Sequence, residues 1–301
     1  MRSSRRALWR YPLFQIPLIF LGLACLGLLL FAFLGLGRPA VGVAIALDLS
    51  NSTYESGDFN APGSTMSQEI DAVRAYLDEN SPQNLRQPNQ VQILGFGGEV
   101  VPLTKSFSDN SQKVKRQLTQ VLQDPQLPEK VEPDQTDIDQ VIQKGISSLE
   151  SLENTCRELL LVTDGKAEVA PATITQAALK KVRLHSIIIG QQAPELRKAA
   201  LATQGIYLSG QINNLDVLFA EDLFSQFNSN LPWIIFWIGS IWIALMWLLV
   251  LPLDRWVLQG MMKLPMPVAG KIALGNAFFW SAATPGIVWR LAGGIPWLSR
   301  C

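Results

Sequence analysis

The sequence predicts an α/β protein with a doubly wound, mostly parallel sheet, flanked by transmembrane helices. Three short, largely apolar runs, residues 41–47, 159–163 and 185–190, are rich in aliphatic and β-branched side chains, which is typical of strands buried on both faces. Helical patterns separate these runs, and such alternation favours parallel strands joined by crossover helices. Two longer uncharged runs, 11–37 and 231–253, each exceed the roughly 20 residues that cross a bilayer.

The elements of the sheet domain can be placed in chain order from their periodicity. We expect strands at 41–47, 91–96, 100–107, 159–163, 185–190 and 206–208, with 100–107 returning antiparallel to 91–96 after a glycine turn. We expect helices at 67–79, 111–122, 136–151, 177–182, 194–203 and 213–228. Residues 53–65 and 124–133 contain proline and many polar side chains and are predicted loops.

The charged residues are segregated along the chain, although the net charge is zero. Residues 1–38 carry five arginines and no acid, residues 39–231 carry 24 acids and 15 bases, and residues 232–301 carry five bases and one acid. An acidic middle segment does not favour nucleic acid as a partner. Basic residues outside both apolar runs predict, by the positive-inside rule, that both termini are cytoplasmic and that the middle segment is extracytoplasmic, in a periplasm or lumen.

These features divide the chain into a basic N-terminal tail at 1–10, a first transmembrane helix at 11–37, the α/β domain at 40–228, a second transmembrane helix at 231–253, and a basic apolar tail at 254–301. A cleaved signal peptide is the alternative for 11–37, but the run is long for one, so we favour a retained anchor. In the tail, Asn276 and Pro285 interrupt the uncharged residues 272–289. We expect residues 272–289 to form either an interfacial or re-entrant segment, which we favour, or a third transmembrane span.

Three oxygen-bearing side chains follow the first strand at alternate positions: Asp48, Ser50 and Ser52. A turn at a strand end can bring such groups to one point, where hard oxygen ligands suit Mg²⁺ or another hard divalent cation. The pattern by itself is also what many turns and helix N-caps contain. Its interpretation therefore depends on the rest of the chain.

Two later stretches supply that context. Asp134-Gln-Thr136-Asp-Ile138 opens a helical pattern, and the strand at 159–163 runs directly into Asp164-Gly165. In this order the motifs resemble the von Willebrand factor A (VWA) domain, in which D-x-S-x-S, a threonine at a helix start and a strand-terminal T-D-G form the metal-ion-dependent adhesion site (MIDAS). The resemblance covers about residues 41–225 and implies a Rossmann-like fold that binds Mg²⁺, or another divalent cation such as Mn²⁺ or Ca²⁺. The metal site that it implies consists of Asp48, Ser50, Ser52, Thr136 and Asp164.

In the family that the chain resembles, the metal accepts an acidic side chain from another protein, so the expected function is metal-dependent protein–protein interaction or complex assembly at a membrane. Because the first strand begins just after Arg38, its carboxyl end and the metal should point away from the bilayer. The alternative is an accessory or regulatory subunit of a membrane enzyme or transport complex, held mainly through its transmembrane helices. The arrangement looks like the Bat-type bacterial membrane proteins, which are associated with MoxR-type AAA+ ATPases, so such an ATPase or other membrane subunits are candidate partners.

An enzymatic role is not expected, and we assign no catalytic residues and no organic cofactor. Hydrolysis at a metal needs a positioned base or nucleophile. The only histidine, His185, starts a buried strand at the end remote from the metal and is interpreted as structural. Glu55 and Asp58, in the loop beside the site, are interpreted as solvated charges rather than as a base or extra ligands.

Overall fold

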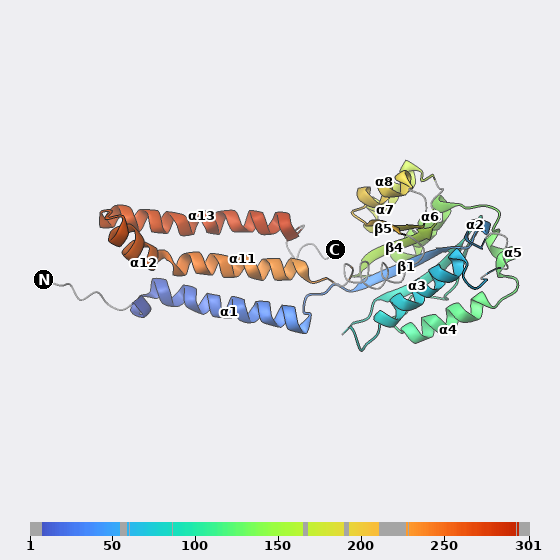
Figure 1. Cartoon of the computed structure of the whole chain (residues 1–301), viewed down its shortest axis with the longest axis horizontal. Helices are drawn as coiled ribbons and strands as arrows, with labels where there is room; N and C mark the ends of the chain where they lie inside the picture. Colours follow the sequence, from blue (N-terminus) through green and yellow to red (C-terminus); the bar gives the residue numbers. More distant parts are fainter. Residues whose placement is uncertain are drawn as a thin grey trace. The chain divides into compact units, whose positions relative to one another are not determined.

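In the computed structural model, the chain forms two compact units. The α/β unit comprises residues 39–228, and the helical unit comprises residues 1–38 and 229–300 (Figure 1). Each unit has its own interior and is described by itself. The structure describes residues 8–54, 59, 61–85, 87–164, 168–189, 193–210, 227, 229–292 and 294.

Within the described residues, the α/β unit is built on one sheet of six strands in the order β3-β2-β1-β4-β5-β6. All neighbouring strands are parallel except β3, which pairs antiparallel with β2. The predicted doubly wound, mostly parallel α/β sheet is confirmed, with the first strand of the chain near its centre. The strands are β1 (Val41–Asp48), β2 (Gln90–Phe96), β3 (Val100–Pro102), β4 (Cys156–Thr163), β5 (Val182–Ile189) and β6 (Tyr207–Gly210).

Helices cover both faces of this sheet (Figure 1). On one face lie α3 (Thr65–Glu79) and α4 (Ser111–Leu122), and on the other lie α6 (Ile138–Glu150), α7 (Pro171–Leu179) and α8 (Pro194–Ala202). Two short helices, α2 (Asn51–Tyr54) and α5 (Leu127–Val131), lie in the connections that follow β1 and α4. The carboxyl ends of the parallel strands are therefore left to loops and short helices, which is where open α/β sheets place their sites.

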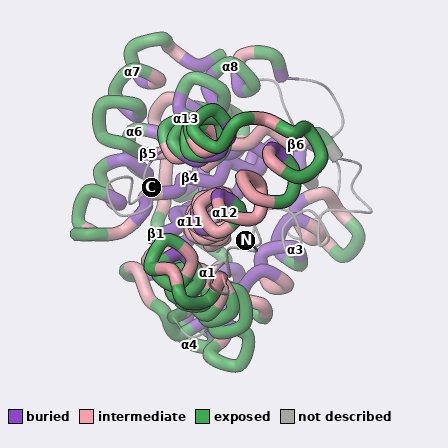
Figure 2. The backbone as a smooth tube through the Cα atoms, turned by 90° about the vertical axis from the view of Figure 1, so that its left-hand side faces the viewer, coloured by how far each residue is buried: buried purple, intermediate pink, exposed green. Residues whose placement is uncertain are grey.

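The side chains of strand β1 alternate between the two covered faces of the sheet, which suits a central strand. All eight of its residues are buried. Val43, Ile45 and Leu47 pack among side chains of α3 and α4, whereas Ala44 and Ala46 lie in the cluster formed with α6. Each of the three larger side chains contributes roughly 1.5–3 kcal/mol on burial, and the small alanines leave room for α6 to approach the sheet. Figure 2 shows the result as buried backbone along β1, β4 and β5.

Several predicted elements differ from the observed ones. The predicted helix 177–182 is wrong: α7 begins at Pro171, whose fixed φ suits the first turn of a helix, and Val182 already starts β5. Strand β3 ends at Pro102 rather than at residue 107, because proline has no N–H to donate to the ladder. The predicted loop 124–133 contains the short helix α5. The predicted helix 213–228 lies outside the described residues, except for Phe227.

The described part of the helical unit contains three long helices, and α11 packs against both of the others (Figure 1). Trp237 of α11 lies directly against Gly27 of α1, where an added Cβ would be 2.7 Å from its ring. Asn230 donates its side-chain amide to the Phe31 and Leu36 carbonyl oxygens at 2.6 and 3.1 Å, which satisfies the open end of α1. The helical segments are Leu8–Arg10, α1 (Pro12–Leu34), α11 (Leu231–Leu248), α12 (Val250–Pro252), a π-helical segment at Leu253–Met261 and α13 (Met266–Ala292).

The segment at residues 272–289 belongs to α13, one continuous helix that lies along α11. Trp247 donates its indole N–H to Ser281 Oγ at 2.9 Å. Nearer the start of α11, Gly239 faces Val288, close to the end of α13. These contacts follow the length of α11 in opposite residue order, so the two helices are antiparallel neighbours.

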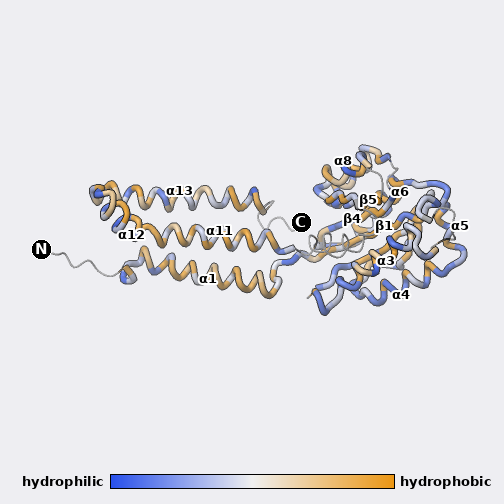
Figure 3. Tube along the Cα trace, viewed as in Figure 1, coloured by the Kyte–Doolittle hydropathy of each residue, from blue (hydrophilic) through white to orange (hydrophobic). Residues whose placement is uncertain are grey.

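Among the described residues, two helical segments are long and apolar enough to cross a bilayer, Pro12–Leu34 and Leu231–Met261. Most of each segment is exposed rather than packed inside the protein, and Figure 3 shows hydrophobic residues along the length of α1 and α11. A helix that is apolar on every side and not enclosed by protein needs another apolar environment.

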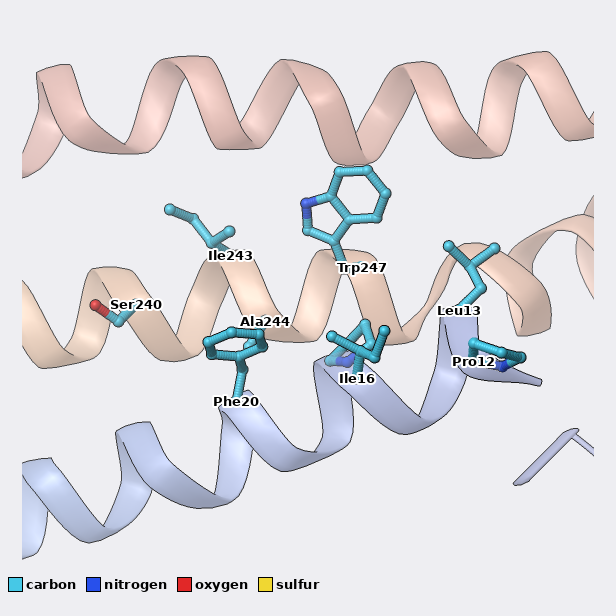
Figure 4. Close-up of a pocket in the computed structure, with 9 residues that line it drawn as sticks. Pro12, Leu13, Ile16, Phe20, Ser240, Ile243, Ala244 and Trp247 are labelled. Atoms are coloured by element: carbon cyan, nitrogen blue, oxygen red, sulfur yellow. The ribbon is translucent and has the colours of Figure 1, made fainter. Parts of the chain in front are cut away.

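An apolar groove of about 500 Å³ opens between α1 and α11 within the helical unit (Figure 4). Ile16 and Phe20 line it from α1, and Ala244 and Trp247 line it from α11. Ser240, also in its wall, donates its hydroxyl to the Phe236 carbonyl at 2.9 Å. The groove therefore presents mainly hydrocarbon to whatever surrounds it.

One buried carboxylate in the core of the α/β unit is well supplied with partners. Glu158 of β4 has no exposed surface, and Arg183 and His185 of the neighbouring strand β5 both contact it. His185 Nδ1 accepts the Ile206 N–H at 3.1 Å, so Nε2 carries the proton that is donated to Glu158 Oε2 at 2.6 Å. Burial by itself raises the pKa of Glu158, but the hydrogen bonds from His185 and Arg183 and the positive charge of Arg183 outweigh it and hold the pKa below its usual value. This engagement agrees with the interpretation of His185 as structural.

Replacing Glu158 by Gln should destabilise the α/β unit by about 3–5 kcal/mol, the usual cost of removing one partner of a buried ion pair. Because the folded pKa of Glu158 is lowered, wild type has this stability in full above the ordinary value of 4.5 and loses it as the pH falls through the folded pKa. Glu158→Gln should therefore unfold with a weaker pH dependence in acid. Urea unfolding of the full chain in detergent between pH 7 and pH 3, followed by far-UV circular dichroism, measures both effects. Equal pH slopes for the two proteins would contradict the assignment.

Candidate functional site

The central strand ends in a carboxylate that is held from two sides. Asp48 is the last residue of β1 and has no exposed surface. Its Oδ1 accepts the Ser50 backbone N–H at 3.0 Å, and its Oδ2 accepts the Thr163 hydroxyl at 2.6 Å. Thr163 is the last residue of β4, the strand beside β1, so the parallel pairing of the two strands brings this donor to the acid.

The surroundings of Asp48 raise its pKa to about 6. Burial is the main cause, hydrogen bonds from Ser50 and Thr163 act in the opposite direction, and the nearby charge of Asp164 adds to the increase. A cation beside Asp48 would offset both the burial and the repulsion from Asp164. The electrostatics of this position therefore favour a bound positive charge.

The two serines of the turn lie next to each other. Ser50 is buried and Ser52 is exposed, and their hydroxyl oxygens are 3.0 Å apart. Thr53 donates its hydroxyl to the Ser50 carbonyl at 2.8 Å, which tightens the turn as it enters α2. The turn thus presents two neutral, hard oxygen donors just beyond the Asp48 carboxylate, from the buried interior out to the surface.

Thr136 is far away in sequence, but its loop is fixed to the same turn. The Asn51 backbone N–H donates to the Pro133 carbonyl at 2.9 Å, and the Asn51 side-chain amide bonds the carboxylate of Asp134. Asp137 then caps α6 by accepting the Gln140 N–H at 2.9 Å, so the loop passes directly into a helix. Thr136 itself is exposed, and the contacts described are those of its neighbours. Its role as a metal ligand stays a prediction.

The glycine pair Gly97-Gly98 makes room for this loop. The Gly97 carbonyl accepts the Asp137 N–H at 2.8 Å, and a Cβ added to Gly97 would lie 2.8 Å from the Val131 carbonyl oxygen. Sequence reasoning placed the pair only in a turn between two strands. The structure shows that its lack of side chains also lets the Thr136 loop dock against that turn.

Asp164 follows β4 directly and is half-buried. Its negative charge raises the pKa of both Asp48 and Glu69, which places the three carboxylates within electrostatic reach of one another. Its role as a metal ligand, directly or through water, stays a prediction. Gly165 and the loop acids Glu55 and Asp58 lie outside the described residues.

Glu69, the third carboxylate, was missed by the sequence analysis. It lies on α3, is completely buried, and neither of its oxygens has a hydrogen-bond partner among the described residues. Burial raises the pKa of Glu69 well above its usual value, and the charges of Asp48 and Asp164 raise it further. A signal for it exists in the sequence, because Glu69 adjoins Ile70 and lies one helical turn before Val73, on the apolar face of the helix.

The donor set fits a hard divalent cation. Oxygen ligands from carboxylates and hydroxyls are those that Mg²⁺, Mn²⁺ and Ca²⁺ use. Within the described ranges, no group of three or more His, Cys, Asp or Glu side chains is arranged to hold a metal, so a cation here would depend on the hydroxyls as well. The unpartnered carboxylate of Glu69, whose pKa Asp48 and Asp164 raise further, adds a third buried or half-buried acid to this part of the unit.

Comparison with known proteins supports the fold. Residues 63–208 match the family model described as the von Willebrand factor type A domain. The von Willebrand factor type A structure from Catenulispora acidiphila gives a TM-score of 0.50 at 15% identity, covering 63% of this chain and 43% of that one. BatB, a conserved hypothetical protein from Bacteroides thetaiotaomicron, gives a TM-score of 0.49 at 17% identity, and the match covers 62% of this chain and 98% of that one. Proximal thread matrix protein 1 from the mussel byssus, with a zinc-occupied MIDAS motif, gives a TM-score of 0.45 at 20% identity, and the match covers 60% of this chain and 46% of that one. No curated protein matches the chain.

Replacing Thr163 by Val should cost about 1–3 kcal/mol of unfolding free energy, because the buried Asp48 carboxylate loses a hydroxyl donor while the side chain keeps its size. Thr155→Val is the matched control just before the same strand, since the Thr155 hydroxyl is buried with no partner among the described residues. That control should be close to neutral. Urea unfolding of the full chain in detergent measures both variants. Equal losses of unfolding free energy would show that the Thr163–Asp48 hydrogen bond does not stabilise the fold.

Proposed function

Because the α/β unit has the von Willebrand factor type A fold, we propose that it binds a divalent cation at the carboxyl edge of its sheet and uses that cation to bind an acidic side chain of a partner protein. The observation that carries this proposal is the buried Asp48 carboxylate, held by Ser50 and Thr163 next to the paired hydroxyls of Ser50 and Ser52. The role is metal-dependent protein–protein interaction or complex assembly.

The two aspartates balance the charge of the cation, and the hydroxyls add neutral ligands. Mg²⁺ takes six ligands and usually keeps several waters, so the exposed side of the site leaves a position for an Asp or Glu of the partner. When bound, the cation supplies an electrophilic centre for that carboxylate. Mg²⁺ fits the set, and Mn²⁺ or Ca²⁺ uses the same oxygen donors. The residues proposed to hold the cation are Asp48, Ser50, Ser52, Thr136 and Asp164.

This function needs no catalytic group, and we propose an interaction module rather than an enzyme. The chain has a single histidine, His185, and it is engaged with Glu158 in the core. A metal site whose open position receives a protein carboxylate requires only that the ligands are held in place. The hydrogen bonds to Asp48 and the docking of the Thr136 loop onto Asn51 support such a role.

We also propose that α1 and α11 anchor the protein in a membrane, with the basic N-terminal tail in the cytoplasm and the α/β unit on the extracytoplasmic side. Helix α13 lies along α11, and Lys271 and Arg290 flank its uncharged part. These two residues are separated by about 28 Å of helix, close to the roughly 30 Å of a hydrocarbon core. Although α13 is not one of the two segments that are apolar enough to span by composition, its packing along α11 favours the third-span alternative for residues 272–289. The C-terminus would then lie on the side of the α/β unit rather than in the cytoplasm, where the charge pattern places it.

An accessory or regulatory subunit of a membrane enzyme or transport complex is the second candidate function. The observation in its favour is the apolar groove between α1 and α11, which offers a hydrocarbon surface to another helix or to a lipid chain (Figure 4). In that case the helices would make the main contacts with the complex. A MoxR-type AAA+ ATPase, expected as a partner from the resemblance, gains no support from the fold or from the matched proteins.

Asp48→Ala should abolish cation binding, because it removes the carboxylate at the centre of the site. We expect a loss of Mg²⁺ affinity beyond the ~10–100-fold that is usual for an outer-shell residue, measured by isothermal titration calorimetry on the full chain in detergent. A partner that co-purifies in Mg²⁺ should be released by EDTA and should be absent with Asp48→Ala. Glu99→Gln, which removes an exposed acid, is the control for net charge. Co-purification that survives Asp48→Ala but not replacement of α1 and α11 would contradict the first function and support the second.

The membrane arrangement is tested by labelling single introduced cysteines with an impermeant maleimide in intact cells and after permeabilisation. Ser147→Cys, exposed on α6, and Leu291→Cys, exposed in the last turn of α13, should both react in intact cells. Lys263→Cys, between the π-helical segment and α13, should react only after permeabilisation. The unaltered chain gives the background. If Leu291→Cys behaves like Lys263→Cys, α13 does not span the membrane.

A further inference from the structure

Glu69 is a buried acid that the proposed ligand set does not use. It has no exposed surface, and both of its carboxylate oxygens lack a hydrogen-bond partner among the described residues. An unpaired buried polar group costs free energy, and an ionised one costs much more. Such a group in a native protein therefore calls for an explanation, and an ion that is bound in the working protein is one of the recognised ones.

Glu69 lies near the start of a helix that packs beside the D-x-S-x-S turn. It is in the second turn of α3, which begins at Thr65 after the Ser64 N-cap and packs on β1 and α2. The buried face of this helix carries Glu69 together with Met66 and Ile70, so the carboxylate is turned toward the sheet and away from solvent. Helices that follow a strand begin at its carboxyl edge, which here is the edge that carries the D-x-S-x-S turn.

The charges that act on Glu69 come from the candidate site. Asp48 and Asp164 are the two charged groups that perturb it, and both are negative. Glu158 shows how the same chain satisfies a buried acid elsewhere, with an arginine and a histidine in contact. Glu69 instead lies within electrostatic reach of two further acids, an arrangement that a divalent cation would stabilise.

We propose that Glu69 is a further residue of the cation site and supplies a third carboxylate charge to the divalent ion through one water, because the described acids are not arranged to ligate one ion together. The inference rests on the proposed function, because it presupposes a cation at Asp48. It changes the expected chemistry of the site, since three carboxylates give a formal charge of −3 instead of −2. Such a site should hold a divalent ion firmly before any partner arrives, and it should favour a trivalent ion such as Tb³⁺ over Mg²⁺ more strongly than a two-carboxylate site does.

Glu69→Gln tests the inference, because it keeps the shape of the side chain and removes the charge. Titration of the full chain in detergent with MnCl₂ should show a Kd about 10–100-fold higher for Glu69→Gln than for wild type, the range found for residues that support a metal from its outer shell. Two matched controls remove an acid elsewhere: Glu99→Gln at the surface and Glu158→Gln in the core. Both should bind Mn²⁺ with the wild-type Kd. The preference for Tb³⁺ over Mg²⁺ should fall in Glu69→Gln alone.

Thermal unfolding provides a readout that does not depend on a partner. Without metal, Glu69→Gln should be as stable as wild type or more stable, because it removes an unpartnered acid from beside two others. With Mn²⁺, its Tm should rise by less than that of wild type. All nine tryptophans lie outside residues 39–228, so far-UV circular dichroism rather than tryptophan fluorescence reports on the α/β unit.

The outcomes separate this inference from the proposed function. If wild type binds Mn²⁺, Asp48→Ala does not, and Glu69→Gln binds as wild type does, Glu69 is no part of the site and the proposed function stands. If wild type binds no Mn²⁺, the proposed function fails and the inference fails with it. Should Glu69→Gln not fold, Glu69→Asp keeps the charge but draws the carboxylate back by one methylene. It should fold and bind Mn²⁺ more weakly, and an unchanged Kd would overturn the inference.

Discussion

The buried charge of Asp48 is the constraint on which the candidate site depends. A carboxylate without exposed surface at the end of a central strand must be compensated within the protein. The neighbouring strand supplies the Thr163 hydroxyl and the following turn supplies the Ser50 N–H. Both donors are neutral, so they lower the cost of burial without removing the charge. The rest of the compensation has to come from a cation or from a proton, and the hydroxyls gathered around Asp48 are suited to the cation.

The α/β unit contains two kinds of buried acid, and their surroundings differ in a way that separates structure from function. Glu158 sits between β4 and β5 with Arg183 and His185 beside it, and its pKa is lowered. Asp48 and Glu69 have raised pKa values and are near other acids. An acid with a fitted basic partner stabilises the fold by itself. Acids that repel one another at the loop edge of a sheet are stabilised by a bound cation or by protonation, and such perturbed groups often mark functional sites.

The helical unit follows a different physical rule. Its described surface is largely apolar, and several of its polar groups bond within the unit: Asn230 to the end of α1, and Trp247 to Ser281 between α11 and α13. Gly27 and Gly239 let the neighbouring helices approach closely, against Trp237 and Val288. Small residues at helix contacts and hydrogen bonds between helices are features that suit packing in an apolar medium, where the hydrophobic effect does not drive helices together.

The sequence by itself determined the elements whose signals are local. The apolar strand at 41–47, the amphipathic helix 67–79 and the two long apolar runs follow from periodicity and composition, and the polar turn after the first strand predicts where a site would lie. A local pattern also misled, since the helix predicted at 177–182 ignored the start signal of Pro171. Only the tertiary structure decided which residues meet. The bond from Thr163 to Asp48 joins residues 115 positions apart and depends on β4 pairing beside β1 in the register that sets Val162 opposite Leu47. The burial of Glu69 depends on α3 packing on the sheet with its apolar face inward. Strand order, register and helix docking are properties of the whole chain, so no single segment predicts them.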